Sequence, residues 1–274
     1  MISVSNISVD IGSRRILEDI SFTARPGQVT VVIGPNGSGK STLLKALCRD
    51  NPFSGTIAIN GHDVGGMSPA MAATMRAVLP QSSTLPFPFT VREVVAMGLT
   101  AGRPGIAPDA LRRLPDEALA RVDLSGFGAR FYGELSGGEQ QRVQLARVIC
   151  QVWQPVLDDV PRYLFLDEPV SSLDIKHQLM IMDVARRFAD AGGGVVAILH
   201  DLNLAAMYAD TIVALRDGRV AGMGTPATVL RDELIASVFD CPMRVGALPP
   251  RSVPFVLPQS VQRPDALSLS SKVA

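Results

Sequence analysis

Apolar positions at the start of the chain alternate with polar ones and then merge into a continuous run. ISVSNISVDI (2–11) and ILEDISFTA (16–24) repeat with a period of two, which predicts strands with one buried face. VTVVI (29–33) is apolar throughout, as expected for a strand that is covered on both faces. GKSTLLKALC (39–48) follows with helical spacing. The chain therefore begins with short antiparallel strands and passes into an α/β unit.

The pattern changes over residues 82–160. Strand-like alternation disappears there, and helical periodicity takes over, interrupted by prolines and glycines. Thr90-Val91-Arg92-Glu93 and Ser136-Gly137-Gly138-Glu139 both have the spacing of a capping box, which starts a helix. We therefore predict a helical subdomain of about 82–160 that is inserted in the α/β core.

Strand-like apolar runs return after this segment. RYLFLD (162–167) and GVVAIL (194–199) predict buried parallel strands, joined by a helix over 175–191. TIVALRDGRVAG (211–222) predicts two strands about an Asp-Gly turn. The chain is rich in proline from residue 249 onward and ends in polar residues. We predict one α/β domain over 1–248 and a proline-rich tail over 249–274, which lies on the surface or is disordered.

The composition is that of a globular protein without overall charge. The chain has 274 residues, of which 47% are hydrophobic, and 26 acidic residues balance 26 basic ones. This is ample for a buried core, and the balance removes the field that attracts nucleic acid or an anionic membrane. Cys48, Cys150 and Cys241 form no C-x-x-C pair, which favours a reducing compartment. No secretory signal and no uncharged apolar run of about 18 residues is found.

A glycine-rich loop between a predicted strand and a predicted helix matches the pattern G-x-x-x-x-G-K-[ST]. Glycines allow the backbone to turn and bring N–H groups to phosphate oxygens, and the helix N-terminus adds partial positive charge. Lys40 is placed to reach the β- and γ-phosphates of ATP, and the Ser41 hydroxyl to ligate Mg²⁺. A chance glycine-rich turn is the alternative, which the flanking elements disfavour. The predicted nucleotide-binding residues of this loop are Gly34, Pro35, Asn36, Gly37, Ser38, Gly39, Lys40, Ser41 and Thr42.

The apolar strand YLFLDE (163–168) ends in two carboxylates. Asp167 is placed to hold Mg²⁺, and Glu168 to orient or deprotonate the attacking water. An Asp-Glu pair after a strand is more often a solvated turn when it occurs alone. Behind a phosphate loop, the hydrolytic interpretation is favoured.

Together these motifs resemble the ATP-binding subunits of ABC transporters, and the resemblance covers about residues 2–230. The decisive run is LSGGEQ (135–140), which is very specific inside a phosphate-loop protein. The other matching motifs, in the family's order, are the phosphate loop (34–42), Gln81, the acidic strand (163–168), Ser171-Ser172-Leu173-Asp174, and His200. The implied fold is a P-loop NTPase ABC cassette with an N-terminal antiparallel β subdomain and an inserted α-helical subdomain.

The resemblance also implies that a second copy of the chain completes the site. Ser136, Gly137 and Gly138 would contact the γ-phosphate of ATP bound by that copy in a head-to-tail dimer. A helix N-terminus supplies N–H groups for this contact, although Ser136 can also merely cap a helix that starts at Glu139. Asp174 would sit at the dimer interface, near the partner's site.

Gln81 and His200 complete the catalytic residues that the resemblance implies, with Glu168. Gln81 would touch the metal and the water, so the implied Mg²⁺ site is Ser41, Gln81 and Asp167. The alternative for Gln81 is a polar loop residue. His200 would contact the γ-phosphate, and its alternative is a strand-end histidine bonded to Asp201.

Two positions depart from the family's pattern. Ile11 precedes Gly12 in the first hairpin, where the family normally has an aromatic residue that stacks on adenine. The adenine contact is therefore left open. Glu139 stands where glutamine is commoner, and we expect this to be tolerated because glutamate also completes a capping box.

The transported substrate is implied only by resemblance. FPFTVREVV (87–95) is similar to importer ATPases for iron chelates, haem and cobalamin, and the segments 149–169, 191–210 and 244–259 are similar to the haem (hemin) importer subgroup. The implied protein is an ATPase at the cytoplasmic face of the inner membrane, bound to a permease dimer that a periplasmic binding protein serves. Ferric-siderophore or cobalamin import is the nearest alternative. A soluble ABC protein without a permease, and a P-loop kinase or GTPase, are alternatives of other classes; nucleic acid is not an expected partner.

Cys241-Pro242 raises a separate hypothesis, because a Cys-Pro pair can ligate haem iron. A buried cysteine before a turn is the favoured alternative. Met67, Met71 and Met75 recur every four residues, which predicts the core face of a helix.

Overall fold

Two sheets organise the molecule, for which the computed structural model describes residues 1–81, 85, 87–101, 105–171, 173–249 and 253–261. The N-terminal sheet is antiparallel with the strand order β2-β1-β4-β5. Its strands are β1 (Ile2–Ile11), β2 (Arg14–Ala24), β4 (Ser54–Ile59) and β5 (His62–Asp63). Alternating burial along β1 and β2 follows the period-two pattern of the sequence, so each presents one face to the core. β1 has the bounds expected from its alternation, and β2 begins two residues earlier than expected.

The central sheet has the order β12-β11-β3-β10-β9-β6. Its strands are β3 (Val29–Ile33), β6 (Arg76–Leu79), β9 (Tyr163–Asp167), β10 (Gly194–Ile198), β11 (Thr211–Arg216) and β12 (Arg219–Gly224). Neighbouring strands run parallel, except that β12 returns antiparallel to β11. Every residue of β3, β9 and β10 is buried, which explains their continuous apolar runs.

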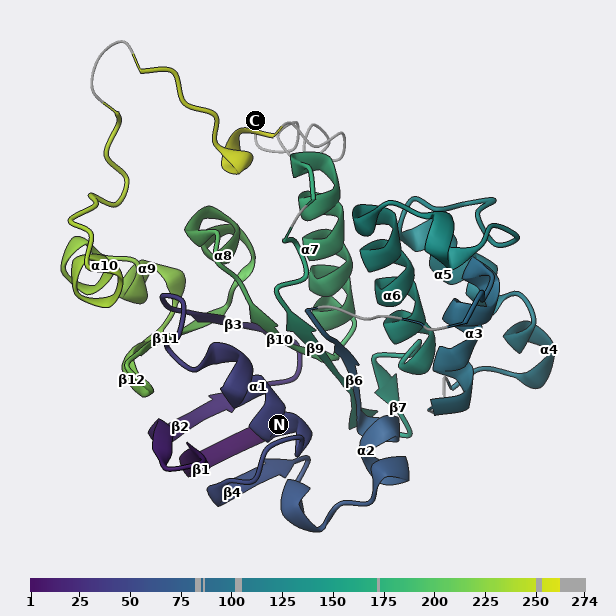
Figure 1. The fold of residues 1–274 in the computed structure, drawn as a ribbon, viewed down its shortest axis with the longest axis horizontal. Helices are drawn as coiled ribbons and strands as arrows, with labels where there is room; N and C mark the ends of the chain where they lie inside the picture. Colours follow the sequence, from purple (N-terminus) through teal and green to yellow (C-terminus); the bar gives the residue numbers. More distant parts are fainter. Residues whose placement is uncertain (82–84, 86, 102–104, 172, 250–252, 262–274) are drawn as a thin grey trace, which may run out of the picture.

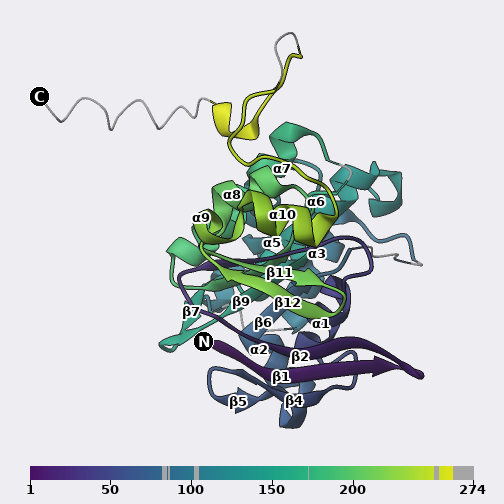
Figure 2. The ribbon, with the colours of Figure 1, turned by 90° about the vertical axis from the view of Figure 1, so that its left-hand side faces the viewer.

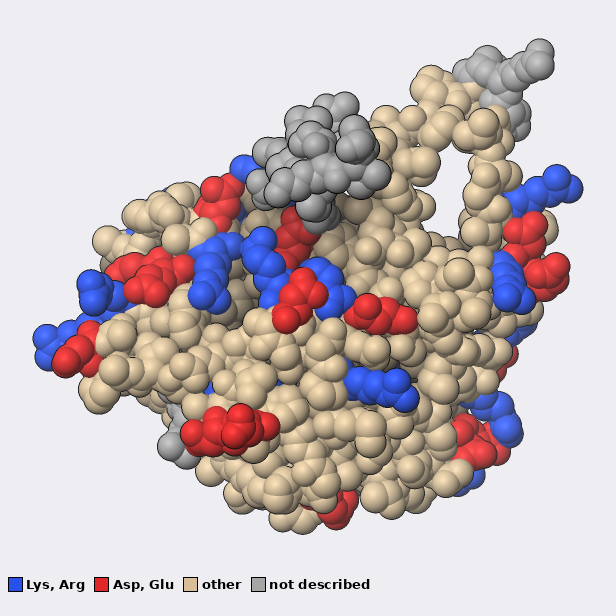
Figure 3. Space-filling view, turned by 180° about the vertical axis from the view of Figure 1, so that it is seen from behind, with Lys and Arg blue, Asp and Glu red and all other residues tan. Residues whose placement is uncertain are grey.

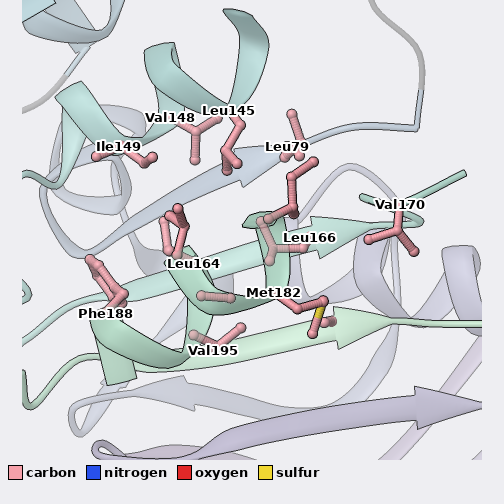
Figure 4. Packing of buried hydrophobic residues seen from close by; sticks show 14 of the residues in the cluster. Leu79, Leu145, Val148, Ile149, Leu164, Leu166, Val170, Met182, Phe188 and Val195 are labelled. Carbon is pink, nitrogen blue, oxygen red and sulfur yellow. The ribbon is translucent and has the colours of Figure 1, made fainter. Parts of the chain in front are cut away.

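Helices cover both faces of the central sheet. Helix α1 (Lys40–Cys48) lies between the two sheets, where Leu43 and Leu47 join the core formed with the N-terminal strands (Figure 1). Helices α6 (Gly137–Gln151) and α7 (Ile175–Asp190) pack on the other face. Figure 4 shows Leu145 and Val148 of α6 over β6 and β9, with Met182 of α7 beside β10. The helix that begins with the LSGGEQ run is therefore anchored in the same core as the acidic strand.

The helical part of the chain connects β6 to its neighbour β9 and lies at one side of the sheet (Figure 1). It contains α3 (Val91–Ala101), α4 (Pro108–Leu111), α5 (Leu114–Arg121), the 3₁₀ turn η2 (Tyr132–Glu134) and α6. Both capping boxes are confirmed: Glu93 Oε2 accepts from the backbone N–H of Thr90 at 2.7 Å, and Ser136 and Glu139 bond reciprocally. The expectation that strands vanish here is wrong, because β7 (Val156–Leu157) and β8 (Val160–Pro161) form a short hairpin.

Past β10, one short helix precedes the β11–β12 hairpin and further short helices follow it. They are α8 (Leu202–Tyr208), α9 (Pro226–Val229), α10 (Asp232–Phe239) and the 3₁₀ turn η3 (Pro258–Ser260). Residues 253–261 are mostly exposed and arch back toward α8, where Gln259 Nε2 donates to Asn203 Oδ1 at 3.0 Å (Figure 2). Residues 250–252 and 262–274 lie outside the described residues, so the boundary at 248/249 and the inserted range of about 82–160 remain predictions.

Two minor expectations are corrected by the fold. Cys241 is exposed, not buried. Met67 precedes α2 (Pro69–Met75) and follows the 3₁₀ turn η1 (Val64–Gly66), so only Met71 and Met75 belong to that helix, although all three methionines contact the core between the sheets. None of the described helices is long and apolar enough to cross a membrane.

A candidate site for nucleotide binding and hydrolysis

The glycine-rich loop connects β3 to α1 at the carboxyl edge of the central sheet. Gly39 caps α1 with φ 100°, and a Cβ there would strike the Leu17 side chain. Gly34 has φ 150°, and a Cβ there would strike the carbonyl oxygen of Leu215. Glycine is therefore required at both positions by backbone conformation and by space, and the loop can lie close to an anion.

The polar groups of this loop fit a phosphate chain. Lys40 Nζ donates to the loop's own carbonyl oxygens, at 2.9 Å to Gly34 and 2.8 Å to Pro35. The Ser38 hydroxyl is buried without a hydrogen-bond partner among the described residues. Burial lowers the pKa of Lys40, although the charges of Glu168 and Asp167 oppose this shift. An unpaired buried hydroxyl and a desolvated ammonium are both groups that a phosphate oxygen would satisfy.

Asp167 and Ser41 meet beside this loop as expected for a divalent cation site. The Ser41 hydroxyl lies 3.3 Å from Asp167 Oδ1. Burial, followed by the charge of Glu168, raises the pKa of Asp167, while the Ser41 hydrogen bond and Lys45 and Lys40 oppose the shift. A hydroxyl and a carboxylate are oxygen ligands of the kind that Mg²⁺ prefers, and a cation would offset the penalty of the buried charge. The donor set therefore fits magnesium.

Gln81, Glu168 and His200 follow β6, β9 and β10, which are neighbours in the sheet. Their side chains converge on one carboxylate. Gln81 Nε2 donates to Glu168 Oε2 at 2.8 Å, and His200 Nε2 lies 2.7 Å from Glu168 Oε1. Asp201 instead caps α8, where its Oδ1 accepts from the backbone N–H of Asn203 at 2.7 Å. The alternative of a His200–Asp201 bond is therefore wrong, and the three residues predicted as catalytic form one cluster.

The signature run has a different local geometry. Ser136 is the N-cap of α6, so the helix begins at Gly137 and not at Glu139. Hydrogen bonds from the Ser136 hydroxyl, at 2.7 Å, and from its backbone N–H, at 2.8 Å, lower the pKa of Glu139. A Cβ at Gly137 would meet open space, whereas one at Gly138 would lie 2.9 Å from Leu173. The N-terminus of α6 is thus open to approach beside Gly137.

The backbone of Glu168 is contacted by a residue that sequence reasoning missed. Gln141, on the second turn of α6, donates from Nε2 to the carbonyl oxygen of Glu168 at 3.2 Å. Ser171 Oγ donates to the same oxygen at 2.9 Å. Asp174 caps α7 through the backbone N–H of His177 at 2.9 Å, and Ser172 lies outside the described residues. In the sequence, the only signal for Gln141 was that it directly follows the signature run.

Ile11 ends β1 and is 53% exposed. It supplies an accessible apolar surface but no aromatic face.

Comparison with known proteins settles the family. A family model described as "ABC transporter" matches residues 17–171, which include the phosphate loop, the signature run and the acidic strand. The chain is 64% identical over 260 residues to a hemin import ATP-binding protein of Mesorhizobium japonicum, covering 95% of this chain and 99% of the relative. The chain belongs to the ABC transporter family. The corresponding protein of Rhizobium meliloti is 55% identical to this ABC cassette, with 95% and 99% covered.

Solved structures carry the same fold. An ATP-binding subunit of an ABC transporter superposes on this cassette with a TM-score of 0.74 at 26% identity, covering 88% of this chain and 96% of that one. A bacterial ABC transporter cassette described as dimeric superposes with a TM-score of 0.70 at 25% identity, covering 82% and 99%. The α/β cassette with an N-terminal antiparallel sheet and a helical region is therefore confirmed.

Proposed function

We propose that this cassette hydrolyses ATP at the edge of the sheet formed by β3, β6, β9 and β10. The observation that carries the proposal is the convergence of Gln81 and His200 on the Glu168 carboxylate. Beside it lies a loop with a buried Ser38 hydroxyl that an anion would satisfy. Lys40 and the backbone N–H groups of residues 34–42 hold the phosphates of ATP. Glu168 accepts the proton of the attacking water, and Gln81 and His200 hold its carboxylate in place.

Ser41 and Asp167, with Gln81 nearby, would hold Mg²⁺, which would neutralise charge on the phosphate oxygens. The Lys40 ammonium would leave the carbonyl oxygens of Gly34 and Pro35 and donate to the γ-phosphate. His200, whose side chain is 43% exposed, is accessible to the same phosphate. The positions of these donors support the assignments.

We further propose that Ser136, Gly137 and Gly138 complete the site of a second copy. The open space at Gly137 and the position of this glycine in the first turn of α6 support this arrangement, because a helix N-terminus favours an anion. ABC cassettes of known structure include dimeric ones, which also supports a head-to-tail pair.

The experiment that tests this site is Glu168→Gln. The amide cannot accept a proton, so hydrolysis should fall by about 10²–10⁴-fold while ATP binding is retained. ATP should then accumulate a stable dimer, measured by light scattering coupled to size-exclusion chromatography. Hydrolysis at the wild-type rate would show that Glu168 is not the base.

We propose that the transport process is hemin import through a separate transmembrane permease. This chain would bind the permease at the cytoplasmic face of the inner membrane. The support is 64% identity to a hemin import ATP-binding protein over nearly the whole of both chains. A periplasmic binding protein would deliver hemin to the permease and would not touch this chain.

Transport is tested by copurifying the cassette with its permease in proteoliposomes. Hemin presented by its binding protein should stimulate ATP hydrolysis and be taken up, whereas ferric siderophore and cobalamin should not. Uptake of either of those ligands in place of hemin would reassign the transporter. Failure to copurify with any permease would favour a soluble ABC protein.

A further inference from the structure

The carbonyl oxygen of Glu168 is an unusual convergence point. It accepts hydrogen bonds from Gln141 Nε2 at 3.2 Å, from Ser171 Oγ at 2.9 Å and from the Ser171 backbone N–H at 3.2 Å. Ser171 belongs to the same loop, but Gln141 belongs to α6. The signature helix thus holds the backbone of the proposed base on its own chain.

Glu168 needs such support because its backbone is strained. Its φ of 50° places it in the left-handed region, which costs a non-glycine residue about 1–3 kcal/mol and persists only where the surroundings enforce it. The backbone conformation of Glu168 also sets the direction in which its side chain leaves the chain. In this conformation the carboxylate reaches both Gln81 and His200.

Helix α6 is well placed to enforce the left-handed conformation of Glu168. The helix packs on β6 and β9 through the core of Figure 4, in which Val170 of the loop after Glu168 also lies. At its first turn Gly138 approaches Leu173 so closely that a Cβ would lie 2.9 Å from the Leu173 side chain. The start of α6 therefore touches the segment 168–173 at two places. A shift of this end of the helix would move the carbonyl oxygen of Glu168.

We propose that Gln141 is a positioning residue that couples the two ATP sites of the dimer. Contact of Ser136–Gly138 with the second copy's ATP seats the start of α6, and Gln141 then holds the Glu168 backbone so that its carboxylate is aimed at the water in its own site. This inference rests on the proposed function, because it assumes the head-to-tail pair and the role of Glu168.

The first test is Gln141→Ala, with Gln141→Glu as its companion because glutamate keeps the size but has no N–H to donate. In both variants kcat for ATP hydrolysis should fall by about 10–100-fold, as for other residues that orient a catalytic group, with KM for ATP unchanged. The matched control is Gln151→Ala. Gln151 lies at the other end of α6 and donates to two carbonyl oxygens, of Ala73 at 3.0 Å and Arg76 at 2.9 Å. The Gln151→Ala substitution should lower thermal stability without changing kcat.

A double-mutant cycle separates positioning from general damage. In the Glu168→Gln background, Gln141→Ala should cause no further loss of residual hydrolysis and should leave the ATP-bound dimer equally stable. A merely structural role would give additive losses and a weaker dimer. Wild-type kcat in Gln141→Ala would overturn the inference even if Glu168→Gln behaves as proposed. Wild-type hydrolysis by Glu168→Gln would instead overturn the proposed function.

The second test addresses coupling directly. Dimers of one wild-type and one Ser136→Arg chain, isolated by two different tags, keep one site with an intact signature run. That site belongs to the Ser136→Arg chain, whose own α6 is not seated. Coupling predicts turnover far below half of the wild-type value, and no further loss when Gln141→Ala is added to the Ser136→Arg chain. Turnover at half of the wild-type value would mean independent sites and would overturn the coupling.

Discussion

The phosphate loop and the signature run are both glycine-rich helix starts, yet their polar groups are in opposite states. In the phosphate loop the Ser38 hydroxyl has no partner among the described residues, and Lys40 bonds the loop's own carbonyl oxygens. In the signature run Ser136 and Glu139 bond each other reciprocally. The first region holds a buried hydroxyl that an anion would satisfy, whereas the second pairs its two polar side chains with each other and leaves an open approach at Gly137.

The pKa values of a carboxylate beside the phosphate loop and of one in the signature run show the same contrast. The pKa of Asp167 is raised, chiefly by burial, while the pKa of Glu139 is lowered, chiefly by the Ser136 hydroxyl. Ionised Asp167 is therefore a cost to the folded protein and ionised Glu139 a gain. The region proposed to bind this chain's own ATP therefore contains unsatisfied polar groups. The surface proposed to contact the ATP of a second copy has its polar side chains paired within the chain.

Lys40→Ala should have the largest effect and tests the incomplete region. It removes the one loop cation, so both ATP binding and hydrolysis should be lost, the latter by about 10²–10³-fold or more. Lys45→Ala, on the same helix but exposed, is the control for the change in charge. Binding is measured with a fluorescent ATP analogue. Retained affinity in Lys40→Ala would remove the contrast between the regions.

Ser136→Arg tests the complete region. ATP binding to the single chain should persist, and hydrolysis should fall by about 10²-fold or more because the second copy's phosphate loses its donors. Ser68→Arg is the matched control, since Ser68 caps α2 and accepts from Met71 N–H at 3.2 Å. Both variants lose a helix cap, at about 1 kcal/mol each. Only Ser136→Arg should lose turnover, and equal losses in both would mean that capping alone explains Ser136.

Gly137→Ala sharpens the contrast between stability and function. Its backbone is not in the positive-φ region and a Cβ meets open space, so alanine should raise stability by about 0.4–1 kcal/mol. The same methyl group fills the approach to the helix N-terminus, and hydrolysis should fall about 10-fold or more. Gly133→Ala, equally open and outside the signature run, should keep wild-type activity. Full activity in Gly137→Ala would mean that nothing approaches there.

Asp167→Asn should have the smallest effect, on thermal stability without nucleotide. Because the folded pKa is raised, the charged carboxylate destabilises the fold at neutral pH, and the asparagine variant should melt about 2–4 °C higher. Protonation removes this cost, so the difference in Tm should shrink as the pH falls through the raised pKa of the wild-type carboxyl. A difference that is constant with pH, measured by calorimetry, would show that the charge of Asp167 is not its cause.

Local patterns allowed much of this molecule to be predicted. The capping boxes at Thr90 and Ser136 join residues three apart, so spacing alone identifies them. The cluster of Gln81, Glu168 and His200 could be predicted only through family resemblance, because it depends on β6, β9 and β10 being neighbours. His200 pairs with Glu168, 32 residues away (200 − 168), and not with the adjacent Asp201. Sequence distance is a poor guide where parallel strands bring their ends together.

By itself the sequence determined the phosphate loop, the strand that ends in Asp167 and Glu168, and the helix that starts at Ser136, because each depends on nearby residues and a short repeat. Only the tertiary structure decided which side chains share the Glu168 carboxylate, and that its backbone is left-handed at φ 50°. It also decided that Gln141 holds the Glu168 carbonyl oxygen. Such contacts depend on how helices pack on a sheet, and buried apolar faces specify that packing without naming the polar pairs that it brings together.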